Sequence, residues 1–69
     1  MYIAHLQDGI YGSFKATGKN KEEAVNTAWK LLASNWCDNP GEFDGEIRGR
    51  EVWWYNREEI MLGVVELIR

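Results

Sequence analysis

The chain of 69 residues has few of the side chains that build disulfides and metal sites, since it contains one cysteine and one histidine. Cys37 cannot form a disulfide within the chain, whereas secreted domains of this size usually carry several. There is no Cys-x-x-Cys pair, so a structural zinc site would also need carboxylate ligands. These absences exclude a disulfide-stapled scaffold and favour a reducing, cytoplasmic compartment.

Long hydrophobic runs are also absent. No window approaches the roughly 18 to 20 apolar residues that span a membrane. No basic stretch followed by an apolar run stands near the N-terminus, where a targeting segment would have one. We therefore expect no membrane association.

The chain has no surplus of positive charge, because 8 Lys and Arg residues face 11 Asp and Glu residues, for a net charge of −3. The balance is uneven: up to Trp36, four basic residues face three acidic ones, and from Cys37 onward four face eight. Nucleic-acid binding is driven by basic residues that release counterions from phosphates. We therefore expect no direct nucleic-acid binding.

What the chain does have is apolar surface: 45% of its residues are hydrophobic and 13% aromatic. This is too rich for a disordered chain, so residues 1–69 should fold as a single domain. A domain near 60 residues buries only about 60% of the surface that its unfolded chain exposes. Its stability should be modest unless a partner or a second copy, as in a homodimer, covers more, and a deep active site is not expected.

The N-terminal segment predicts an antiparallel hairpin. Residues 2–6 and 10–14 have the composition of β-strands. Between them, Asp8-Gly9 supplies the positive φ angles that a tight turn needs. In the second strand Ile10, Gly12 and Phe14 should face one side of the sheet, because side chains alternate along a strand.

A helix should follow. Asn20, with Glu23 three residues later, forms a capping-box variant. Beyond it, apolar side chains recur at spacings of three and four and predict one buried stripe: Ala24, Val25, Ala28, Trp29, Leu31, Leu32 and Trp36. The helix should end near Asn35 or Trp36, because the residue before Pro40 is disfavoured in helical geometry.

The C-terminal half predicts more sheet. Residues 38–46 form an acidic connection, and residues 46–55 are a β-rich run that Gly49 interrupts. Residues 56–69 fit a helix by spacing, with a second capping box at Asn56, or a strand by their β-branched composition. We favour the strand, with residues 55–59 turning a hairpin. The predicted fold is a small α+β domain in the order ββαββ, an antiparallel sheet with one helix packed on one face.

Two features suggest a binding surface. In the run Trp53-Trp54-Tyr55, Trp53 and Tyr55 share one side of a strand and Trp54 takes the other. A sheet with one helix leaves one face uncovered, so at least one of these aromatic residues can anchor a partner or, alternatively, be covered as extra core. The connection adds four carboxylates that can meet a basic surface on a partner: Asp38, Glu42, Asp44 and Glu46.

The sequence gives weaker support to metal-binding and catalytic sites. The acidic residues do not match a calcium-loop spacing, so we expect no metal and no cofactor. His5 and Cys37 suggest a small hydrolase, but catalysis would need them in contact and a lowered thiol pKa. Arg48 and Arg50, two residues apart on one strand face, could grip a carboxylate or phosphate, but we expect them to pair with carboxylates on neighbouring strands. We expect no enzyme.

One local resemblance comes from the run Tyr2-Ile3-Ala4 with Gly18-Lys19-Asn20-Lys21-Glu22-Glu23-Ala24 and Ala28. It is similar to the strand-to-helix entry of HicB-type antitoxins, which carry a Gly-x-Thr-x-Glu-Glu-Ala pattern before an amphipathic helix. The similarity covers about a third of the chain, and Asn20 stands where that pattern has threonine. It implies an antitoxin-like or RNA-interacting module.

The function predicted from the sequence is therefore stoichiometric binding to a larger protein or nucleoprotein. Small size, an acidic connection and surplus aromatic residues are typical of the inhibitors that phages and mobile elements encode. The antitoxin-like module is the alternative, and a hydrolase built on His5 and Cys37 is the remote one.

Overall fold

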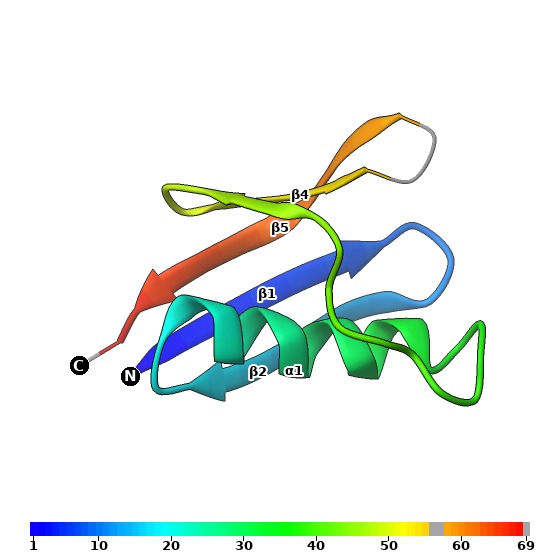
Figure 1. Ribbon diagram of the computed structural model, residues 1–69, viewed down its shortest axis with the longest axis horizontal. Coiled ribbons are helices and arrows are strands. Elements are labelled where there is room, and N and C mark those ends of the chain that lie inside the picture. Colours follow the sequence, from blue (N-terminus) through cyan, green and yellow to red (C-terminus); the bar gives the residue numbers. More distant parts are fainter. Residues whose placement is uncertain (56–57, 69) are drawn as a thin grey trace.

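The computed structural model describes residues 1–55 and 58–68, and within them it has one helix and five strands (Figure 1). The elements are β1 (Tyr2–Asp8), β2 (Gly12–Gly18), α1 (Lys21–Ala33), β3 (Glu46–Arg48), β4 (Glu51–Tyr55) and β5 (Glu59–Leu67). All strand pairs are antiparallel, in the order β2-β1-β5-β4-β3. The predicted α+β class, with one helix on one face of an antiparallel sheet, is confirmed. No helix in the described ranges is long and apolar enough to cross a membrane.

The sheet has one strand more than the predicted order ββαββ, because residues 46–55 form two strands. Arg48 pairs with Glu51, and Gly49 between them has a φ of +63°. A positive φ at the first central residue is typical of the type II′ turn that joins hairpin strands, and glycine adopts it without steric cost. Gly49 thus closes a hairpin where the sequence predicted an interruption.

The first hairpin has a longer turn than predicted. Asp8 pairs with Gly12, and its side-chain oxygen accepts hydrogen bonds from the amides of Ile10 (2.7 Å) and Tyr11 (3.0 Å). The positive φ lies at Gly12 (+93°) and not at Gly9. Ile10 therefore stands in the loop, 84% exposed, instead of in the strand as expected.

The helix begins as predicted. The side chain of Asn20 accepts a hydrogen bond from the amide of Glu23 at 2.8 Å and satisfies one of the free first-turn donors. The helix ends earlier than predicted, at Ala33, and the chain turns through residues 34–36. Trp36 is consequently 42% exposed, and Leu31, placed in the stripe, is 47% exposed.

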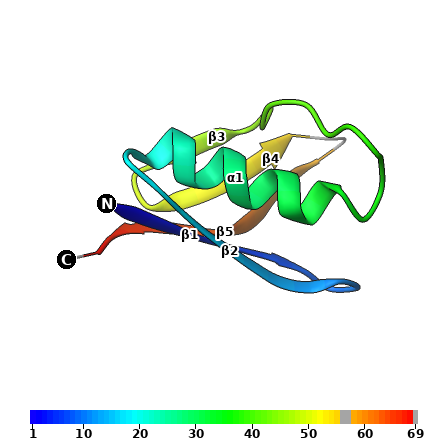
Figure 2. The ribbon, with the colours of Figure 1, turned by 90° about the horizontal axis from the view of Figure 1, so that it is seen from below.

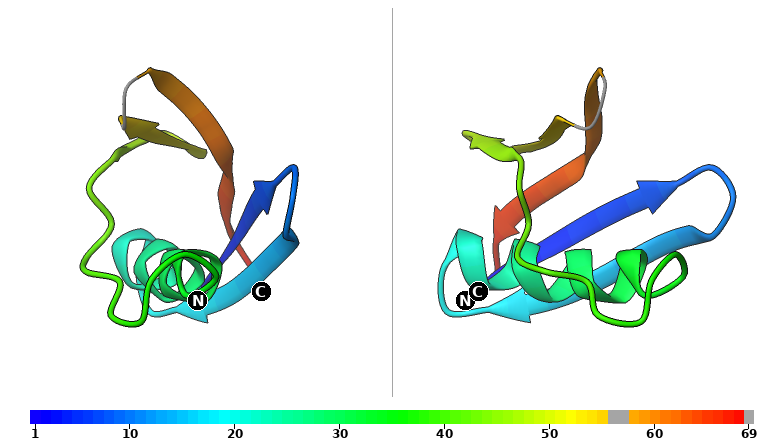
Figure 3. Two further views of the ribbon diagram at one scale, coloured as in Figure 1. Left: turned by 90° about the vertical axis from the view of Figure 1, so that its right-hand side faces the viewer. Right: turned by 45° about the vertical axis from the view of Figure 1, so that its right-hand side comes forward.

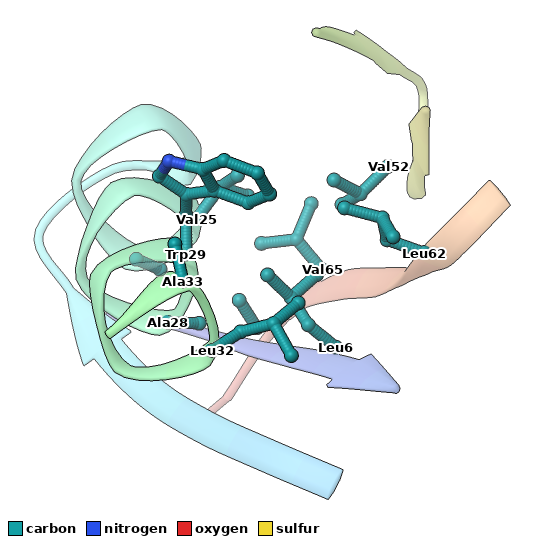
Figure 4. Packing of buried hydrophobic residues seen from close by; sticks show 11 residues of the cluster. Leu6, Val25, Ala28, Trp29, Leu32, Ala33, Val52, Leu62 and Val65 are labelled. Carbon is teal, nitrogen blue, oxygen red and sulfur yellow. The ribbon is translucent and has the colours of Figure 1, made fainter. Parts of the chain in front are cut away.

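The core lies between α1 and the sheet, which curls around the helix (Figures 2 and 3). In Figure 4 the buried helix side chains face Leu6 and Val65, with Val52 and Leu62 beyond them. The buried set is Ala4, Leu6, Ala24, Val25, Ala28, Trp29, Leu32, Ala33, Val52, Leu62 and Val65. Helix and sheet approach closely at Gly18, where an added Cβ would lie 2.5 Å from the amide nitrogen of Ala24. These buried residues lie on one face, and no element among the described residues covers the opposite face of the sheet, the open face.

The C-terminal segment is a strand, as favoured from its composition. β5 is central in the sheet and pairs with both β1 and β4. Its register with β4 shifts between Val52, which pairs with Gly63, and Trp53, which pairs with Met61. The predicted turn over residues 55–59 and the alternative cap at Asn56 lie partly outside the described residues.

Candidate protein-binding surface

Strand alternation in β4 divides the aromatic run between the two faces of the sheet. Val52 is fully buried in the core on the helix side of the sheet, so Trp54, two residues on, lies on the same inner side. Trp53 and Tyr55 point to the open face, both half-buried. The predicted division of the three aromatic residues is therefore confirmed.

On the open face, four side chains form one group, which we call the open-face cluster: Arg48, Trp53, Tyr55 and Met61. The guanidinium carbon of Arg48 lies 4.8 Å from the Trp53 ring centre and 5.7 Å from that of Tyr55, both within cation–π range. Met61 pairs with Trp53 across the strands and is 50% exposed. The cluster thus combines apolar surface with one cation, held on three adjacent strands.

Three carboxylates surround the open-face cluster and satisfy its polar atoms. The Tyr55 hydroxyl donates a hydrogen bond to Glu46, and it accepts one from Arg48. Arg48 also pairs with Glu59 at 3.1 Å, and the Trp53 indole N–H donates to Glu51 at 3.1 Å. Arg48 thus pairs with carboxylates, but not on the adjacent strand as predicted, since Glu46 lies on β3 itself and Glu59 on β5. Arg50, in the turn after β3, pairs with Glu66 on β5 at 2.6 Å. With their polar ends engaged, the aromatic rings are fixed in position.

The hydrogen bond between Glu46 and Tyr55 shifts the pKa of both side chains. The hydrogen bond from the Tyr55 hydroxyl lowers the pKa of Glu46 below its ordinary value of 4.5, because it stabilises the carboxylate. The same bond raises the pKa of Tyr55 above its ordinary value of 10.0, because the neutral phenol is the donor. At neutral pH the pair is therefore a carboxylate with a neutral phenol.

Trp54 belongs to a second aromatic group on the helix side. Its ring stacks on Trp36 (5.5 Å between centres, 14° between planes) and lies 5.1 Å from Trp29. Phe43 meets Trp29 edge-on at 5.4 Å. The Trp54 indole N–H donates to Asp44 at 2.8 Å. Trp54 and Asp44 were both predicted to bind a partner. In the structure their hydrogen bond holds the segment of residues 38–46 against the sheet.

The four predicted acidic residues do not form one patch. Asp38 is exposed after the helix, and Glu42 pairs with Lys30 on the helix at 3.7 Å, both side chains being exposed. Asp44 is bonded to Trp54 on the inner side, and Glu46 joins the open face. Of these four, Glu46 alone lies beside the open-face cluster.

His5 and Cys37 are not brought together. His5 lies between the buried Ala4 and Leu6 on β1, so its side chain points to the open face. Cys37 follows the helix, which covers the inner face, and is exposed. The sheet separates the two side chains. Within residues 1–55 and 58–68, no three His, Cys, Asp or Glu side chains are grouped as a metal site would require.

Three exposed apolar residues near Trp53 and Trp54 were not expected from the sequence: Met61, Ile60 and Trp36. Met61 lies on the open face, and Ile60 (43% exposed) pairs with Trp54 beside Trp36. The alternation of residues 59–62 could have indicated Met61 as a neighbour of Trp53. The exposure of Trp36 had no comparable signal, since it depends on where the helix ends.

Comparison of the chain with protein-family models, with curated proteins and with solved structures finds no match. The local resemblance to HicB-type antitoxins stays a prediction. Its residues form the start of β1, the end of β2, the cap at Asn20 and the first turns of α1.

Proposed function

We propose that this protein is a non-enzymatic protein-binding module that inhibits a larger macromolecular machine, of the kind that phages and mobile elements encode, by stoichiometric binding. The observation that carries the proposal is the open-face cluster, an apolar and aromatic group on a sheet face that no element within the described residues covers. Trp, Tyr, Met and Arg are the residues enriched in protein interfaces. A cytoplasmic location agrees with the free, exposed Cys37.

The arrangement of charges supports a protein partner over a nucleic acid. The single cation of the open-face cluster, Arg48, is already engaged by Glu46 and Glu59. Phosphates would meet these carboxylates, and like charges at short distance repel. A partner with a basic rim around an apolar centre would instead find complementary groups.

The small size of the domain supports inhibition by occupation of a surface over catalysis in a deep site. A domain of this size can act on a large machine by occupying a surface that the machine needs.

The test uses the purified protein as bait in a lysate of the cell that encodes it, followed by reconstitution with the purified partner. Light scattering should give a complex of fixed stoichiometry. Met61→Lys should abolish it, because the interface would have to desolvate the lysine beside Trp53. Ile10→Lys is the matched control, since Ile10 is also exposed but lies in the β1–β2 loop.

Two results would overturn the proposal. One is a failure of the binding test, either because no stoichiometric complex forms or because Met61→Lys and Ile10→Lys weaken it equally. The other is turnover of a substrate by the purified protein that Cys37→Ser or His5→Ala abolishes while folding is retained.

A further inference from the structure

A pocket on the helix side, separate from the open-face cluster, is lined by Glu22, Val25, Asn26, Phe43, Gly45 and Ile47. It lies between the first half of α1 and the segment that leads into β3. Its floor is apolar, since Val25 is buried and Phe43 and Ile47 are half-buried. At about 230 Å³ it suits one side chain better than a metabolite.

The pocket presents two polar groups. The Asn26 side-chain oxygen accepts a hydrogen bond from the Phe43 amide at 2.7 Å, so its NH₂ group is the end left to donate. Glu22 is exposed and has no ion-pair partner within 4.0 Å among the described residues. Its neighbour Lys21 is bound instead to the Gly49 carbonyl at 2.7 Å. The pocket therefore offers a carboxylate acceptor, an amide donor and an aromatic wall.

We infer that this pocket receives an arginine side chain of the protein partner. The methylene stem would lie on Val25 and Ile47, and the guanidinium would reach the Glu22 carboxylate beside the Phe43 ring. Arginine fits the carboxylate and the aromatic wall because its planar fork pairs with carboxylates and packs on aromatic faces. The guanidinium has no acceptor, so the Asn26 NH₂ group would donate to a backbone carbonyl beside the arginine. The inference rests on the proposed protein-binding function and specifies the chemistry of the partner.

The position of β3 connects the pocket with the open-face cluster. β3 is an edge strand of the sheet, and its side chains alternate between the two faces. Ile47 lines the pocket, while on the other side Arg48 belongs to the open-face cluster and Glu46 contacts it. A partner seated over this edge would reach both sites.

The inference is tested on the isolated protein with N-acetyl-arginine N-methylamide as the probe, followed by amide NMR. Shifts should concentrate at Val25, Asn26 and Ile47 and include the Asn26 side-chain NH₂. The citrulline analogue, which has nearly the same shape without the charge, should bind more weakly. Glu22→Gln should weaken binding of the arginine probe about fivefold, as for a partly exposed ion pair.

Glu23→Gln is the matched control, because Glu23 lies in the same helical turn outside the pocket lining and is equally affected by the helix dipole. It should bind the probe like the parent protein. Equal binding of the two probes, equal effects of the two variants, or shifts located elsewhere would overturn the inference. None of these results touches the stoichiometric complex, so failure of the pocket and failure of the proposed function are distinguishable.

Discussion

Two glycines show how single residues determine the packing of the sheet. Gly63 lies between β1 and β4, where an added Cβ would be 1.8 Å from the carbonyl oxygen of His5. Gly45 lies where a Cβ would be 1.9 Å from the carbonyl oxygen of Trp53. At both positions the backbones of neighbouring segments approach too closely for any side chain.

Gly63→Ala should therefore lower the free energy of unfolding by about 1 to 3 kcal/mol, the usual cost of an overpacked position. Gly41→Ala is the control, since nothing lies within 4 Å of a Cβ there. Urea unfolding of both variants measures the difference. A midpoint for Gly63→Ala equal to that of the control would contradict the close approach of β5 and β1.

The Glu46–Tyr55 hydrogen bond predicts a pH dependence with two limits. Because the pKa of Glu46 is lowered, its contribution to stability is present above 4.5 and is lost as the pH falls through the lowered value. Because the pKa of Tyr55 is raised, its contribution is present below 10.0 and is lost as the pH rises through the raised value.

Tyr55→Phe removes this bond. The difference in Tm between the parent and this variant should be largest between about pH 5 and 9 and shrink toward both extremes. Tyr11→Phe, whose hydroxyl makes no hydrogen bond within the described residues, should show no such profile. A difference that stays constant from acid to alkali would disprove the pairing.

The helix is the element whose buried face carries most of the core. Trp29 is 6% exposed and contacts Trp36, Phe43 and Trp54. Trp29→Ala should cost about 3 to 5 kcal/mol, enough to unfold much of a small domain. Leu31→Ala, on the exposed side of the same helix, should change little. Thermal melting of both variants is the measurement, and a Trp29→Ala protein that melts within a few degrees of the parent would refute the core assignment.

The elements that were predictable from sequence depend on local chemistry. The Asn20 cap and the apolar spacing of α1 specify the helix, and composition favours a strand for residues 59–67. The end of the helix was not predictable, because nothing before Pro40 breaks it. Its actual end at Ala33 allows the chain to turn so that Trp36 stacks on Trp54, a tertiary contact.

The candidate site was likewise predictable only where local sequence patterns determine it, and not where tertiary contacts do. Alternation alone placed Trp53 and Tyr55 on one side of the strand and Trp54 on the other, without showing which side is open. It could not show that Asp44 bonds to Trp54, or that Glu42 lies against Lys30, since these partners are 10 and 12 residues away along the chain. Only the curled sheet brings Glu46, Glu51 and Glu59 around one cluster.

At the scale of the whole molecule, two exposed carboxylates, Asp38 and Glu42, lie away from the open-face cluster, on the segment after the helix. The net charge of −3 can steer encounter with a basic partner, while Met61 and Trp53 can hold the complex once water is excluded. The structure indicates which variants separate these effects. Asp38 and Glu42 are exposed and support no buried contact, whereas Asp44 and Glu46 stabilise the fold through Trp54 and Tyr55.

Asp38→Asn combined with Glu42→Gln should therefore slow association with the purified partner and flatten its salt dependence, leaving dissociation nearly unchanged. Met61→Ala should do the reverse, because loss of a desolvated apolar contact speeds dissociation. Surface plasmon resonance at several salt concentrations separates the two rates. If the charge variant dissociates faster, or if Met61→Ala changes only the association rate, then electrostatic steering and apolar anchoring are not divided between these residues, and the partner sits elsewhere on the molecule.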